Sequence, residues 1–169
     1  MHLETGLIES DLKTMQITKA SEYGVLGLMA LARRPAGTVV MIDEVSREES
    51  LSRSFMAKIF QSLSKSGLVR SVRGTGGGFV LAKKAEEITV LSVIEAIEGP
   101  IALQRCLEQT PVCSHLEGCV LCGLFAEAQN KLKETLGRVT VADLVKRKAH
   151  LPGQSKPGVN KGELSFATR

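Results

Sequence analysis

The run from Ser50 to Ala85 constrains the fold and the partners of this chain more than any other feature of the sequence. It contains seven basic residues and no Asp or Glu. The rest of the chain has 15 basic and 18 acidic residues, so its formal charge is −3 although the whole chain carries +4. A cationic segment within a mildly acidic protein indicates a polyanionic partner. The basic residues are Arg53, Lys58, Lys65, Arg70, Arg73, Lys83 and Lys84.

The same run has the pattern of a helix followed by a hairpin. Ser52 suits the N-cap of a helix, and Gly67 suits its left-handed end. Residues 68–73 alternate apolar and polar side chains, 74–78 form a glycine-rich tip, and 79–83 resume the apolar pattern, which predicts a β-hairpin. A short helix over 42–47 and a turn at 49–50 precede this helix, so the whole predicts a helix-turn-helix with a wing. The helix carries the apolar residues Phe55, Met56, Ile59, Phe60 and Leu63, of which Phe55, Met56 and Phe60 are assigned to its core.

The remaining segments complete a mainly α fold with one small β-hairpin. A first helix is expected over 18–33, with apolar Tyr23, Leu26, Met29 and Ala30 at helical spacing, and a further helix is expected from Thr89 to Gly99. A long helical stripe begins at Leu121, and it has so little core of its own that we expect it to form a homodimer interface. The expected units are a flexible N-terminal extension (1–14), a winged helix-turn-helix DNA-binding domain (15–100), a cysteine loop (101–122), dimerisation helices (123–148) and a disordered tail (149–169). The stripe consists of Phe125, Ala128, Leu132, Leu136 and Val139.

Composition narrows the class of protein. The 169 residues are 43% hydrophobic and 24% charged, which are ordinary globular values. No apolar run approaches the roughly 20 residues that cross a bilayer, and the first residues do not form a signal peptide. We therefore expect a cytoplasmic protein without a membrane partner.

Ten residues are candidates for contact with double-stranded DNA. The leading turn of a recognition helix reaches base edges in the major groove, while flanking cations hold phosphates. Ser52, Arg53 and Ser54 occupy that turn, and Arg53 suits a bidentate contact with guanine. Further along the helix, Lys58, Gln61 and Lys65 suit phosphate or peripheral contacts. Arg73, beside the wing tip, suits the minor groove or a phosphate. The tip itself, where glycines permit close backbone approach, contributes Gly74, Thr75 and Gly76.

The four cysteines lie in one short window with the spacing C-x6-C-x5-C-x2-C, and they are Cys106, Cys113, Cys119 and Cys122. In a reducing compartment, such clustering indicates a metal or redox site rather than disulfides. Zinc favours two close pairs, and only one is present, whereas wider intervals suit an iron–sulfur cluster. The spacing alone leaves iron–sulfur, zinc and metal-free redox thiols open. An enzymatic thiol oxidoreductase is disfavoured, because the C-x2-C pair lacks a surrounding βαβ pattern and no catalytic constellation accompanies it.

The residues from about Met15 to Lys148 resemble the IscR/NsrR-type winged-helix regulators of the Rrf-two family. The resemblance rests on the opening Met15-Gln16-Ile17-Thr18, the run SRSFMAKIFQSLSKSGLVRSVRGTGGGFVLAKK and the cysteine loop that follows. It implies a dimeric transcription regulator, not an enzyme, whose iron–sulfur cluster of the 2Fe–2S or 4Fe–4S type controls DNA affinity.

The resemblance also implies a ligand set. Three ligands would be Cys106, Cys113 and Cys119, and Cys122 stands where the iron–sulfur biogenesis regulators have a histidine. In nitric-oxide-sensing relatives an acidic residue of the first helix of the partner completes the site, and Glu22 matches that position. The fourth ligand is therefore Cys122 or Glu22 of the partner subunit.

The function expected from these features is a transcriptional regulator, a repressor, that binds a pseudo-palindromic operator and responds to iron–sulfur status, redox state or nitric oxide. The alternative is a zinc- or thiol-based winged-helix regulator without an iron–sulfur cluster.

Overall fold

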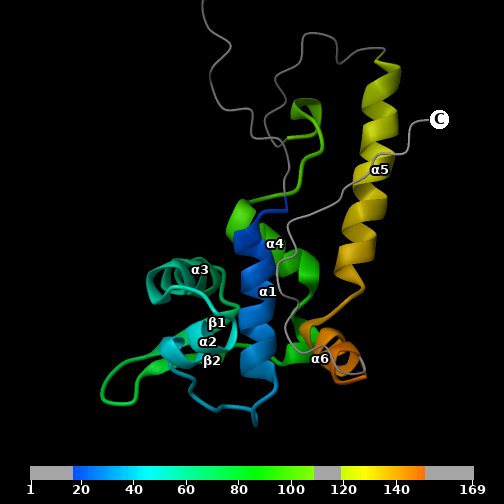
Figure 1. Ribbon diagram of the computed structural model, residues 1–169. Helices are drawn as coiled ribbons and strands as arrows, with labels where there is room; N and C mark the ends of the chain where they lie inside the picture. Colours follow the sequence, from blue (N-terminus) through cyan, green and yellow to red (C-terminus); the bar gives the residue numbers. More distant parts are fainter. Residues whose placement is uncertain (1–16, 109–118, 151–169) are drawn as a thin grey trace, which may run out of the picture.

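The computed structural model describes residues 17–108 and 119–150. These described residues form a mainly helical domain with one hairpin, and one long helix rises away from the rest (Figure 1). The helices before the cysteine segment are α1 (Lys19–Ala32), α2 (Ile42–Glu48), α3 (Arg53–Lys65) and α4 (Val90–Glu98), with a short 3-10 turn η1 (Ala85–Glu87). The strands are β1 (Val69–Val72) and β2 (Gly78–Leu81), and the later elements are the 3-10 turn η2 (Arg105–Leu107), α5 (Val120–Gly137) and α6 (Val141–Ala149).

Helix α1 forms the centre of the domain. It contacts α2, α3, α4, α6 and β2, and the Thr18 side chain caps its N-terminus by accepting from the backbone N–H of Ala20. Because neighbours cover several of its faces, Leu28 and Leu31 are buried, although the expected apolar stripe omitted them. Gly27 permits close packing, since a Cβ there would lie 2.7 Å from the ring of Phe60.

Helices α2 and α3 form the predicted helix-turn-helix. The turn between them places Ser50 at a φ of 56°, and the Ser52 hydroxyl accepts from the N–H of Phe55. The core prediction for α3 is confirmed at Met56 and Phe60, which are buried together with Ile59 and Leu63. It is wrong at Phe55, which is 37% exposed. Phe55 lies at the flank of the buried stripe and packs edge-on against Tyr23, with ring centroids 6.0 Å apart.

The hairpin after α3 forms the wing. Gly67 follows α3 at a φ of 68°, and β1 pairs antiparallel with β2 so that Val72 lies opposite Gly78. The wing is attached to the connection between α1 and α2 by two backbone hydrogen bonds of 2.9 Å between Val40 and Phe79. This attachment fixes the wing beside the helix-turn-helix.

Helix α6 belongs to the core of the winged domain. It contacts α1 and η1, and Val141 at its start is fully buried. Thr89 and Thr140, which cap α4 and α6, form an antiparallel bridge. The sequence grouped α6 with the dimerisation helices of 123–148. Within one chain α6 packs against α1, with Val141 in the core, and its place among the dimerisation helices stays a prediction.

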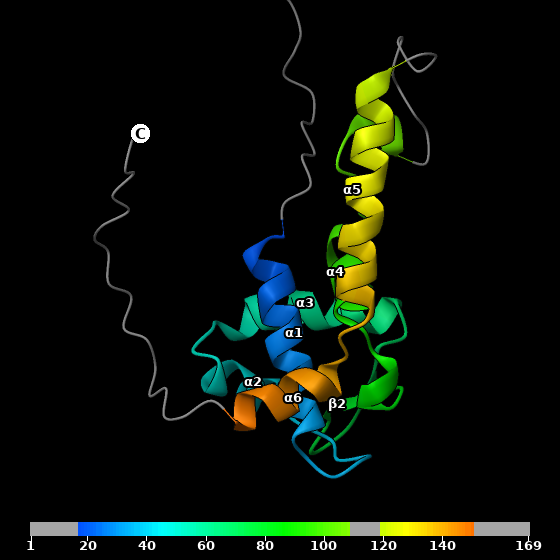
Figure 2. The same ribbon diagram turned by 90° about the vertical axis from the view of Figure 1, so that its right-hand side faces the viewer.

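Helix α5 begins earlier than expected. The cysteine loop was predicted to reach residue 122, but Cys119 is the N-cap of α5 and Cys122 lies in its first turn. The residues that follow Val120 are mostly apolar and include no Pro within α5, so they are compatible with a helix. Helix α5 contacts α4 and η2 and extends beyond the body of the domain (Figure 2). The extension of 1–14, Cys113, and the tail beyond residue 150 lie outside the described residues. Within the described ranges, no helix is both long and apolar enough to cross a membrane.

Candidate nucleic-acid interface and cysteine segment

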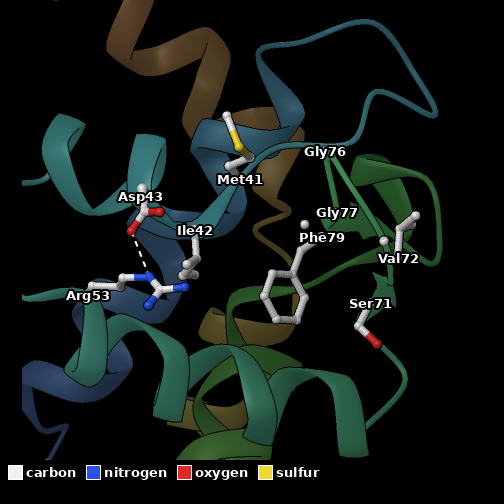
Figure 3. A pocket seen from close by; sticks show the side chains of 11 residues that line it. Met41, Ile42, Asp43, Arg53, Ser71, Val72, Gly76, Gly77 and Phe79 are labelled. Atoms are coloured by element: carbon white, nitrogen blue, oxygen red, sulfur yellow. Dashed lines mark ion pairs between the residues drawn. The ribbon is translucent and has the colours of Figure 1, made fainter.

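The leading turn of α3 is fully accessible. Ser52, Arg53 and Ser54 are all exposed, and the Ser52 and Ser54 hydroxyls lie 3.4 Å apart. Arg53 does not extend freely into solvent, because its Nε lies 2.7 Å from Oδ1 of Asp43 (Figure 3). Asp43 lies in the first turn of α2, so the ion pair connects the starts of the two helices of the helix-turn-helix.

An open cavity of about 410 Å³ separates this turn from the wing. Its walls include Arg53 and Asp43 on the helical side and Gly74 and Gly76 at the wing tip. Gly74 and Gly76 have φ values of 108° and 77°, which L side chains rarely adopt. The tip glycines thus shape the far wall of a groove that opens beside the recognition helix.

The other candidate DNA contacts are exposed as well. They lie along α3 and around the wing tip, and none forms an ion pair within the described residues. The basic run therefore presents its charge to solvent, with Arg53 as its one acid-paired member in the described chain. These residues are Lys58, Gln61, Lys65, Arg73, Gly74, Thr75 and Gly76.

Sequence reasoning missed Asp43 as part of this surface. The acid-free run starts at Ser50, so a residue seven positions earlier is outside the window in which charge was counted. Asp43 and Arg53 lie on two helices separated by a turn, so no periodicity within one element relates their side chains. Only the packing of α2 on α3 brings the two side chains together.

The cysteine segment is described at three of its four thiols. Cys106 lies in η2, which contacts α5, while Cys119 and Cys122 are one helical turn apart at the start of α5. All three are partly buried. Within residues 17–108 and 119–150, no three Cys, His, Asp or Glu side chains gather closely enough to hold a metal ion. Two thiolates on one turn, with a third on the packed η2, have the donor chemistry of an iron–sulfur or zinc site, and a complete set needs Cys113 or another ligand.

Two polar contacts hold the chain where it approaches the cysteines. Oε1 of Gln129 accepts from the N–H of Leu103 at 3.0 Å, and Gln129 is the buried residue of α5. Glu98, at the end of α4, accepts from the hydroxyls of Thr18 and Ser21. These contacts connect the entry to the cysteine segment with α5 and with the start of α1.

Glu22, the alternative ligand, faces solvent near the start of α1. Its carboxylate lies 2.5 Å from Nζ of Lys19, and the two side chains are largely exposed. The hydrogen bond from Lys19 to Glu22, followed by their charge attraction, raises the pKa of Lys19. The side chain of Glu22 is thus accessible to a second molecule.

Comparison with known proteins decides the family. Residues 17–147 match the model of the Rrf2 family, described as iron-dependent transcriptional regulators. The chain belongs to the Rrf2 family. Its sequence is 31% identical over 134 residues to the HTH-type transcriptional regulator IscR of Pectobacterium atrosepticum, which covers 79% of this chain and 81% of that protein.

Solved structures place this Rrf2 protein among winged-helix regulators. CymR (YrzC), the global cysteine regulator of B. subtilis, aligns with a TM-score of 0.66 and 25% identity over 79% of this chain and 98% of CymR. IscR of T. potens aligns with a TM-score of 0.64 and 24% identity over 82% of this chain and 93% of IscR. The predicted fold and the resemblance are confirmed, and the relatives are transcriptional regulators rather than enzymes.

Proposed function

We propose that this Rrf2-family regulator is a homodimeric repressor whose affinity for a pseudo-palindromic operator is controlled by an iron–sulfur cluster. The observation that carries the DNA-binding part is the groove between α3 and the wing. Arg53 lies on one wall and the tip glycines on the other, and the surrounding cations are exposed. This arrangement suits a recognition helix in the major groove, with the wing against the adjacent backbone.

Base contacts are assigned to Ser52, Arg53 and Ser54, and backbone contacts to the other candidates. A residue that holds a phosphate should act on all sequences alike, because its contribution arises from counterion release. Lys58→Ala should therefore weaken binding to specific and non-specific duplexes equally and should reduce the slope of log K against log salt by about 1. An unchanged slope would remove Lys58 from the interface.

The second copy is assigned to α5, at exposed apolar side chains near its start that lie outside the expected stripe of residues 125–139. Val120, Leu121 and Leu124 are 85%, 54% and 59% exposed although all three are large and apolar. Burial of such a face against a symmetry-related copy would remove it from water. The helix extends beyond the body of the domain, so this exposed face is accessible to a second copy (Figure 2).

The cluster is assigned to Cys106, Cys113 and Cys119, with Cys122 or Glu22 of the partner subunit as the fourth ligand. Support comes from the two thiols on the first turn of α5 and from the packing of η2 on that helix. When bound, the cluster supplies a redox-active group whose potential depends on its ligands. The protein residues connect that group to α5, and hence to the dimer that sets the spacing of the two recognition helices.

A zinc- or thiol-based regulator is the second candidate. It is favoured by the likeness to CymR, the global cysteine regulator of B. subtilis. This alternative keeps the DNA-binding surface and changes only what the thiols do.

Anaerobic purification with iron and sulfide quantification separates the two candidates. The cluster proposal predicts coloured protein that contains iron and sulfide, and the combined serine variant of Cys106, Cys113 and Cys119 should be colourless. Cys122→Ser and Glu22→Gln then identify the fourth ligand, because the true one should shift the visible spectrum. Colourless wild-type protein that contains zinc or no metal, yet binds DNA, would establish the alternative.

A further inference from the structure

Arg53 differs from every other basic residue of the run in having an acidic partner. Its Nε lies 2.7 Å from Oδ1 of Asp43, and the two side chains are 72% and 51% exposed. Within the described residues, Lys58, Lys65 and Arg73 form no ion pair. The one cation in the leading turn of the recognition helix is therefore the one with a carboxylate against it (Figure 3).

The geometry of the pair leaves part of the guanidinium open. An arginine has five N–H donors in a planar fork, and Asp43 contacts the side that carries Nε. The two terminal nitrogens, Nη1 and Nη2, remain at the end of the side chain. Guanine presents O6 and N7 together on its major-groove edge, which matches two parallel N–H donors.

The carboxylate acts differently on the two kinds of contact that Arg53 could make. It repels a phosphate and partly neutralises the cation, so it weakens a simple backbone contact. It also limits the conformations of a flexible side chain and fixes the plane of the guanidinium, which favours a bidentate base contact. Phosphate contacts are already available from exposed cations without acidic partners.

We infer that Asp43 is a positioning residue that orients Arg53 to read guanine and reduces its attraction to DNA backbone. Asp43 thus raises sequence specificity at some cost in non-specific affinity. This inference rests on the proposed entry of α3 into the major groove, and it adds a specificity determinant from α2. The cavity between Arg53 and the wing tip keeps the open end of the guanidinium accessible to DNA.

The test uses the full chain and two probes. A duplex operator selected by the wild-type protein from a randomised pool gives specific binding, and poly(dA-dT), which contains no guanine, gives non-specific binding. The variants are Asp43→Ala, Arg53→Ala and the double variant. The matched control is Glu86→Ala, which removes one negative charge from the exposed turn η1 and touches neither Asp43 nor Arg53.

Asp43→Ala should lower the ratio of specific to non-specific affinity by about tenfold, the value of one good bidentate base contact. Its affinity for poly(dA-dT) should stay the same or rise, because the variant lacks the negative charge of Asp43. Glu86→Ala should keep the wild-type ratio. In the Arg53→Ala background, Asp43→Ala should change the ratio no further, since the residue that it positions is absent.

An unchanged ratio of specific to non-specific affinity in Asp43→Ala overturns the inference. The inference also fails if Asp43→Ala lowers this ratio as much in the Arg53→Ala background as it does in the wild-type protein. If circular dichroism shows that Asp43→Ala fails to fold, Asp43→Ser takes its place, because serine suits a helix N-terminus but cannot reach Arg53. A wild-type protein that selects no sequence overturns the proposed function itself. If the preference for the operator depends on Arg53 but not on Asp43, only the positioning role of Asp43 is overturned.

Discussion

Gly78→Ala should detach the wing from the helical body. A Cβ at position 78 would lie 2.7 Å from the carbonyl carbon of Val40 and closer still to its oxygen. The favourable separation of non-bonded carbon atoms is about 3.5–4.0 Å, so roughly 1 Å of movement is needed. Both atoms belong to the backbone and cannot rotate away. The wing must therefore move from the connection to which its hydrogen bonds hold it.

The cost follows from the two responses open to the structure. If the wing stays, overpacking costs about 1–3 kcal/mol. If it moves, the two 2.9 Å hydrogen bonds between Val40 and Phe79 are lost, at about 0.5–1.5 kcal/mol each. Either response lowers the free energy of unfolding by about 1–3 kcal/mol. For a chain of this length, Tm should fall by about 2–12 °C.

Thermal unfolding and DNA titration measure the two consequences. Gly78→Ala should unfold at lower temperature and should bind an operator more weakly, because the wing no longer lies beside α3. The matched control is Gly137→Ala, where a Cβ would meet Leu91 at an ordinary 3.7 Å. Alanine in that helical position should raise stability by up to about 0.5–1 kcal/mol. Equal stability of Gly78→Ala and wild type would refute the proposed attachment of the wing.

Three further outcomes are expected. Hydrogen bonds from the backbone N–H and the hydroxyl of Thr140 lower the pKa of Asp143 below its ordinary 3.8, so its stabilising effect is present above pH 3.8 and is lost as the pH falls through the folded value. Asp143→Asn should therefore flatten the acid side of a plot of stability against pH. Leu124→Glu should convert a dimer into a folded monomer in light scattering, and a persistent dimer would exclude that face. Gln129→Leu should lower the free energy of unfolding by about 1 kcal/mol in the same thermal assay, because the N–H of Leu103 loses its acceptor.

The elements that local sequence determines were predictable. Ser52 caps a helix as expected, and Thr89 and Thr140 cap helices in the same way, because a side-chain oxygen before an apolar run satisfies a free backbone N–H. The wing was predictable because strand alternation and a glycine tip are local signals. The ten candidate DNA contacts are exposed because they lie off the apolar stripe of α3 or on the hairpin tip.

The features that could not be predicted from the sequence depend on contacts between segments that are distant along the chain. Leu28 is buried because neighbours surround α1, and no periodicity in α1 alone shows that it is central. The ion pair of Asp43 with Arg53 and the hydrogen bond of Gln129 with Leu103 require packing across a turn and across the cysteine segment. A polar residue on an apolar helix gives no local sign that it is the buried one. Assignment of α6 to the core depends in the same way on its contact with α1.

Titration of an operator duplex with anaerobically isolated protein, before and after removal of its iron and sulfide, tests the central claim most directly. The account predicts that the two forms differ in affinity by at least about fivefold, the lower end of typical allosteric coupling. Arg53→Ala should lose operator preference in both forms. Equal affinities of the two forms would contradict cluster control of DNA binding, even if the protein contains iron.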